Sequence, residues 1–118
     1  MKYLCLIYDD EKKMADMPKA EGDAFMGEYF GFTNDIKQSG HYVAGEALHP
    51  VSTATTVRIR NGKVSTTDGP FAETKEQLGG FYLVEAKDLN EAIQVAQRIP
   101  SVRIGSIEIR PVVDFSQA

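Results

Sequence analysis

The sequence contains a single cysteine, Cys5, and no tryptophan. One cysteine cannot form an intramolecular disulfide, and no Cys-x-x-Cys pair is present for zinc binding or redox chemistry. The longest strongly apolar run, Tyr3–Tyr8, is far shorter than a membrane-spanning helix, and acidic residues follow it where a signal peptide would have a cleavage region. We therefore expect a cytoplasmic protein.

Basic residues are the minority, because 13 Lys and Arg stand against 17 Asp and Glu, which gives a formal net charge of −4. This balance argues against general binding to nucleic acid or to an anionic membrane surface. No phosphate loop, dinucleotide fingerprint or Gly-x-Ser-x-Gly motif occurs, so no nucleotide cofactor is expected. The two histidines, His41 and His49, lie too far apart on one element to pair as ligands, and we expect no metal site.

The 118 residues fit a single domain, 1–118. The spacing of Phe25, Tyr29, Phe32 and Ile36 is that of one buried helical face, and Ser39-Gly40 is a stop signal. Asp88 with Glu91 predicts the capped start of a second helix, and we expect its buried stripe to be Leu89, Ala92, Ile93, Ala96 and Ile99. We expect a strand at 3–8, a loop at 10–22, a helix at 25–36, a strand at 41–48, a hairpin at 55–67, a connection at 72–78, a strand at 81–86, a helix at 88–99 and a strand at 104–113. Gly79-Gly80 is expected to act as a breaker between the connection and the strand that follows it.

The clearest local signal is Asn61-Gly62, because both central positions of a type I′ turn need a positive φ. A two-residue loop pairs Arg60 with Lys63 and Ile59 with Val64. The hairpin is then apolar on one side and polar on the other.

Two helices packed on one face of a mainly antiparallel sheet give an α+β, ferredoxin-like order, β-α-β-(β-β hairpin)-β-α-β. The segments 3–8 and 81–86 are apolar on both faces, whereas two helices cover only one. Each further buried Leu or aromatic side chain is worth roughly 1.5 to 3 kcal/mol. We therefore expect a homodimer, a dimeric α/β barrel in which two sheets pack face to face, with a ligand cleft between the sheets or at their rim.

Ionisable residues gather after the hairpin and on three strands. Asp68 would serve as an acid or base influenced by burial and by Lys75, with Glu73 or Glu76 as a second carboxylate; the alternative is a turn-capping residue in water. Glu46 lies on an alternating strand, where it faces either a cavity or solvent. The candidate binding residues beside Asp68 are Tyr8, Glu46, Phe71, Glu73, Lys75, Glu108 and Arg110. Alternatively, Glu108 and Arg110 form a surface ion pair, Tyr8 is a packed aromatic and Phe71 anchors the loop in the core.

The string DGPFAETKE at 68–76 resembles the signature of the DGPF group within the YCII-related superfamily. GEAL at 45–48, ATTVR at 54–58, GGFYLVEA at 79–86, EAI at 91–93 and IEIRP at 107–111 are similar to that group in the same order. The resemblance implies a ferredoxin-like protomer, a dimeric α/β barrel and a cleft near the signature loop.

Superfamily members with a known reaction act as small aromatic-ring lyases, with a histidine early in the first helix and an aspartate before the last strand. This chain has no histidine among residues 23–26, and its second helix ends in Arg98-Ile99-Pro100 without an aspartate. The lyase mechanism therefore does not transfer. The DGPF branch is also associated with alternative sigma factors.

Two functions remain. In the first, the protein binds a small organic ligand in the inter-sheet cleft, with Asp68 as the acid or base, Glu46, Glu73 and Arg110 orienting the ligand and Phe71 forming a wall. In the second, it is a non-enzymatic accessory module that meets a sigma-factor-like protein through its acidic surface. The residues alone leave open whether the chain is an enzyme.

Overall fold

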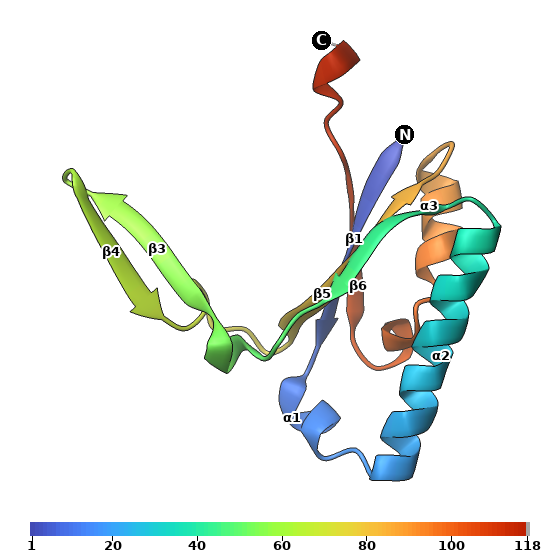
Figure 1. Ribbon diagram of the computed structural model, residues 1–118, viewed down its shortest axis with the longest axis horizontal. Helices are drawn as coiled ribbons and strands as arrows, with labels where there is room; N and C mark the ends of the chain where they lie inside the picture. The colour runs from blue at the N-terminus through green and yellow to red at the C-terminus, as the bar shows by residue number, and fades with distance from the viewer. Residues whose placement is uncertain (118) are drawn as a thin grey trace.

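The structure, a computed structural model, describes residues 1–117 and is built on an antiparallel sheet of order β2-β5-β1-β6. Helices α2 and α3 lie on one side of it (Figure 1). The elements are β1 (Lys2–Asp9), α1 (Glu11–Ala15), α2 (Lys19–Gln38), β2 (Tyr42–Ala47), β3 (Thr55–Arg60), β4 (Lys63–Asp68), β5 (Gln77–Glu85), α3 (Leu89–Ala96) and β6 (Ser106–Pro111), with 3-10 turns η1 (Val51–Thr53), η2 (Pro100–Arg103) and η3 (Phe115–Gln117). The α+β class and the predicted order of strands and helices are confirmed.

The core lies between the helices and one face of the sheet. Along β1, Tyr3, Cys5 and Ile7 are buried, while Leu4 and Leu6 between them are partly exposed. This alternation follows from the two-residue period of a strand. Burial raises the pKa of the Cys5 thiol to about 11, which keeps it protonated and unreactive.

The predicted end of α2 and the predicted start of α3 are both present. Gly40 adopts a φ of +81° just after α2, a conformation that glycine reaches without steric cost. The Asp88 side chain accepts the Glu91 N–H at the start of α3. The carboxylate of Glu91 accepts the N–H of Lys87, and this bond together with the one from His41 lowers the pKa of Glu91.

Three local expectations are wrong. The segment 10–22 is not a loop throughout, because Asp10 accepts N–H groups of Lys12 and Lys13 and so caps the short helix α1. The connection predicted at 72–78 ends at Glu76, because β5 begins at Gln77 and runs through Gly79-Gly80. A side chain at Gly80 would lie 2.8 Å from the carbonyl oxygen of Glu46 on β2, so this glycine permits strand pairing there and does not end the strand.

The predicted apolar stripe of α3 is also partly wrong. Leu89 and Ile93 are about half exposed, whereas Val95 is buried together with Ala92 and Ala96. The helix ends at Ala96, and buried Ile99 lies in the turn before η2, which Pro100 opens. The helix thus ends three residues earlier than predicted, and Ile99 is buried outside it.

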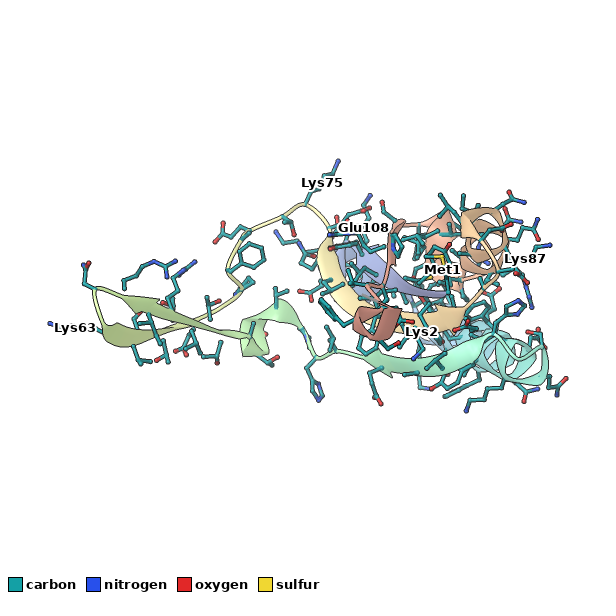
Figure 2. All side chains as sticks on the ribbon, turned by 90° about the horizontal axis from the view of Figure 1, so that it is seen from above. Met1, Lys2, Lys63, Lys75, Lys87 and Glu108 are labelled. Atoms are coloured by element: carbon teal, nitrogen blue, oxygen red, sulfur yellow. The ribbon has the colours of Figure 1, made fainter. Side chains whose placement is uncertain are left out.

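Strands β3 and β4 form a separate hairpin with the predicted register, Arg60 opposite Lys63 and Ile59 opposite Val64. Asn61 and Gly62 have φ of 53° and 75°, as the type I′ turn requires. We call Thr55–Asp68 the arm. It projects from the side of the sheet opposite α2 and α3 (Figures 1 and 2).

The face of the sheet opposite the helices is apolar at its centre. Leu4 lies opposite Leu83 and Leu6 opposite Phe81, and all four are partly exposed. We call these four residues the open face. The two-sided apolar strands expected from the sequence are therefore present.

Two glycine substitutions test the contrast between close approach and open space. Gly80→Ala is expected to lower the free energy of unfolding by about 1 to 3 kcal/mol, because the backbone of β2 must move away from the new methyl group. Gly27→Ala, in α2 with nothing within 4 Å of the new methyl group, is expected to raise it by about 0.5 to 1 kcal/mol. Urea unfolding of both variants measures the difference, and equal effects would contradict this account of the β2–β5 contact.

Candidate functional site

A cavity of about 290 Å³ lies on the helix side of the sheet, between α1, the first half of α2 and the β2–β5 edge. Its walls are mostly aromatic and aliphatic. The cavity is lined by Ile7, Asp9, Met14, Phe25, Met26, Tyr29, Phe30, Thr33, Tyr42, Gly45, Glu46, Ala47, Gly79, Gly80, Phe81 and Tyr82. Few polar groups interrupt this apolar lining, an arrangement typical of small-molecule sites.

Asp9 supplies the only carboxylate in the wall that is partly withdrawn from solvent. It is the last residue of β1 and continues the inward-facing series of Cys5 and Ile7. Its Oδ2 accepts a hydrogen bond from Ser101 at 3.1 Å. Its Oδ1 is buried and has no hydrogen-bond partner among the residues that the structure describes.

Gly105 makes room for this carboxylate. A side chain there would come within 2.8 Å of Asp9 Oδ1 and would clash with the carbonyl oxygen of Tyr8. Any residue other than glycine at 105 would therefore force the end of β1 to move. The position of Asp9 Oδ1 therefore depends on the absence of a side chain at residue 105.

Ser101 joins Asp9 to Tyr29 of α2. The Ser101 Oγ and Tyr29 Oη atoms are 2.5 Å apart, and Ser101 is fully buried. The single hydroxyl proton of Ser101 is donated to Asp9, so Tyr29 is the donor to Ser101. The result is a directed chain, Tyr29 to Ser101 to Asp9, that ends on the unpartnered carboxylate oxygen.

Burial sets the ionisation of this chain. Desolvation raises the pKa of Asp9, nearby Glu76 raises it further, and the hydrogen bond from Ser101 opposes both. Burial raises the pKa of Tyr29 to about 12, so its hydroxyl stays protonated. A carboxyl group with a raised pKa beside an apolar cavity is a candidate for taking up and releasing a proton.

A second polar pair lies in the same wall. Tyr82 Oη and Thr33 Oγ1 are 2.5 Å apart, and burial raises the pKa of Tyr82. The ring of Tyr82 meets Phe32 edge to face with centroids 5.1 Å apart. These contacts fix the position of the Tyr82 hydroxyl opposite α2.

The eight residues predicted from the sequence do not come together in one site. Glu46 borders the cavity but is exposed. Tyr8, Glu108 and Arg110 cluster beside the open face: Tyr8 Oη donates to Glu108 Oε1 at 3.3 Å, and Arg110 lies 3.6 Å from the same carboxylate. Partial burial and the charge of Glu108 raise the pKa of Tyr8.

Asp68, Glu73 and Lys75 border an open groove beside α1, and all three are exposed. Lys75 extends outward from the loop between β4 and β5 (Figure 2). Phe71 is 81% exposed, so it does not anchor its loop in the protomer's core. The structure thus brings Asp68 together with Glu73 and Lys75, but not with Glu46, Arg110 or Tyr8.

Asp9, Ser101 and Tyr29 were not among the residues predicted from the sequence. Asp9 was treated as the acidic boundary of the first strand, although its parity with Ile7 places it on the inward face. Tyr29 was assigned to the core stripe of its helix. Ser101 follows Pro100 and carries no motif, so only the fold brings its hydroxyl to Asp9.

Within residues 1–117, no three His, Cys, Asp or Glu side chains come together in a way that would hold a metal ion. None of the helices in this range has both the length and the apolar character needed to cross a membrane.

Substitution of Ser101 tests the hydrogen-bonded chain. Ser101→Ala removes the bond that lowers the pKa of Asp9, so that pKa is expected to rise, and the protein is expected to lose about 1 to 3 kcal/mol of stability because Tyr29 loses a buried partner. Carboxyl-carbon NMR titration and urea unfolding measure the two effects. Ser65→Ala on the exposed arm is the matched control and should change neither; an unchanged Asp9 pKa in Ser101→Ala would contradict the chain.

Comparison with known proteins shows that the fold is shared with a solved enzyme structure. The 5-chloro-2-hydroxyhydroquinone dehydrochlorinase of Burkholderia phenoliruptrix AC1100, in complex with 2,5-dihydroxybenzoquinone, superimposes with a TM-score of 0.56 over 99% of this chain and 98% of its own. The two sequences are 12% identical, so the likeness concerns the fold.

The sequence itself has a nearer relative. An uncharacterised protein of Rhizobium meliloti (strain 1021) is 35% identical over 114 residues, which cover 95% of this chain and 92% of that protein. The family model of the YCII-related domain matches residues 1–116. The chain therefore belongs to the YCII-related domain family.

Proposed function

We propose that this protein binds a small, single-ring organic molecule in the cavity beside Asp9 and that Asp9 exchanges a proton with it. The observation that carries the proposal is that Asp9, a partly buried carboxylate whose Oδ1 has no hydrogen-bond partner among the described residues, lies in the wall of an aromatic-lined cavity. A buried polar atom without a partner is costly unless a ligand completes it. A hydroxyl group on the bound ring would supply the missing hydrogen bond.

The dimensions of the cavity support a ligand of this size. Its volume of about 290 Å³ lies at the lower end of the range of roughly 300 to 1,000 Å³ found for small-molecule pockets. Aromatic walls favour edge-to-face packing with a ring. Phe25 and Tyr29 already pack in this way, with centroids 5.4 Å apart.

The proton transfer needs only the groups present. Ionised Asp9 accepts a proton from a ligand hydroxyl, and its charge is held by the Ser101 hydrogen bond, which Tyr29 supports in turn. The protonated carboxyl then returns the proton to a carbon or oxygen of the ligand. This exchange is the acid/base step of a lyase-like reaction. The fold neighbour, whose described substrate is a chlorinated, hydroxylated ring, supports the choice of ligand class.

The signature string at 68–76 supports the inference that the chain falls in the DGPF group of its family. The open face supports a homodimer, because sheet-to-sheet packing would remove its hydrocarbon from water. An inter-sheet cleft with Asp68 as the acid or base stays a prediction that competes with the Asp9 cavity. The alternative function is that of a non-enzymatic module that binds a sigma-factor-like protein. Neither of the two similar proteins has a name that refers to a sigma factor.

Ligand binding distinguishes Asp9 from Asp68. In a thermal-unfolding screen of monohydric and dihydric phenols, a ligand at 100 times its Kd is expected to stabilise the wild type by about 2.7 kcal/mol. Asp9→Asn should weaken that ligand at least tenfold, whereas Asp68→Asn, an exposed and charge-matched control, should leave it unchanged. The reverse pattern would place the site at Asp68, and binding of no ring compound at all would contradict the proposal.

The difference in unfolding free energy between Asp9→Asn and the wild type should depend on pH. Because the folded state raises the pKa of Asp9, the contribution of this group to stability is complete below its unfolded pKa and is lost as pH rises through the folded pKa. The variant does not ionise, so its stability relative to the wild type should increase between pH 4 and pH 7. Urea unfolding across this range measures the trend, and a difference that falls with pH would mean that the native Asp9 carboxylate is stabilised instead.

A further inference from the structure

The arm is the part of the protomer that has least to hold it in place. It is a two-stranded hairpin that pairs with no strand of the main sheet among the described residues. Its apolar face is exposed, with Val57 and Ile59 each 62% and Val64 67% accessible. An isolated two-stranded hairpin is marginally stable in water, and three or more strands or a packing partner are normally needed.

The arm and the open face together form a concave corner. Both views show the arm leaving the sheet on the side away from the helices (Figures 1 and 2). A notch of about 780 Å³ lies between the base of the arm, the end of β1 and the start of β5, and is lined by Tyr8, Leu48, Val51, Val57, Phe71 and Leu78. Val57 places the apolar face of the arm on this notch, and Phe71 of the DGPF string borders it as well.

The length of the arm fits a layer stacked on the open face. Six residues of strand extend about 20 Å, and a second sheet packs about 10 Å away from the first. The arm is therefore long enough to pass the edge of a stacked sheet and to lie along the flank of the molecule that carries it.

The charges of the arm and of the rest of the chain are opposite. The arm carries Arg58, Arg60 and Lys63 against Asp68, a net charge of +2, so the remaining residues carry −6. A second copy therefore offers the arm an acidic body as well as an apolar open face. Opposite charges on the two contacting surfaces favour this orientation over others.

We propose that the arm packs its apolar face against the flank of a second copy of this chain, whose sheet is stacked on the open face, and that the two copies exchange arms symmetrically. A two-fold axis makes the contact reciprocal, so each arm closes the corner of the other copy. The arm then gains the packing that it lacks in the single protomer, and Val57, Ile59 and Phe71 leave water.

Two double variants on the same arm test the contact. Val57→Gln with Ile59→Gln places two amides on the apolar face, and Ser65→Gln with Thr67→Gln places the same two amides on the polar face. Sedimentation velocity over a dilution series is expected to give a dimer Kd at least a hundredfold weaker for the first variant, and within about threefold of the wild type for the second.

Amide hydrogen exchange reports on the arm directly. Exchange of the β3 and β4 amides in the wild type should slow as the concentration rises through the dimer Kd, while exchange in β1 stays constant. The far-UV circular dichroism spectrum of each variant shows whether it is folded, whether or not a ligand binds at Asp9.

Three results would overturn the proposal: a compact monomer at tens of micromolar, a dimer that the Val57 and Ile59 changes leave unaffected, or arm exchange that does not depend on concentration. The second result would leave a sheet-to-sheet dimer in place without the exchanged arms. None of the three would bear on proton transfer by Asp9.

Discussion

The structure depends on the two-residue period of β1. Tyr3, Cys5 and Ile7 point towards the helices and anchor the core, and the same period places Asp9 on that side where the core ends. A shift of one residue would move these side chains to the open face and take Asp9 out of the cavity. The hydrophobic pattern that folds the protein is therefore also the constraint that withdraws a carboxylate from water.

Much of the scaffold was predictable because it rests on local signals. Asn61-Gly62 specified the arm's turn and register, Ser39-Gly40 the end of α2, and Asp88 the start of α3. The failures came where tertiary contact outweighs local preference. Gly80 reads as a break in isolation, but in the sheet it is the residue that lets β2 approach β5.

The candidate site was less predictable than the fold, for the same physical reason. Asp68, Glu73 and Lys75 are charged and adjacent in sequence, which drew attention to them, yet they lie in water. Asp9, Tyr29 and Ser101 are distant in sequence, and their shared property is that folding buries them together. Contacts between residues so far apart in sequence leave no recognisable sequence motif. The one available signal was the alternation of β1, which places Asp9 on the same face as Cys5 and Ile7.

The central claim, that Asp9 is the group that meets a ring-bearing ligand, is tested most directly by a crystal structure of the protein soaked with the best-binding phenol. The account predicts the ring between α2 and the β2–β5 edge, with a hydroxyl within hydrogen-bond distance of Asp9 Oδ1. A ring bound beside Asp68, or at the Asp9 cavity with its hydroxyl turned away from the carboxylate, would contradict it.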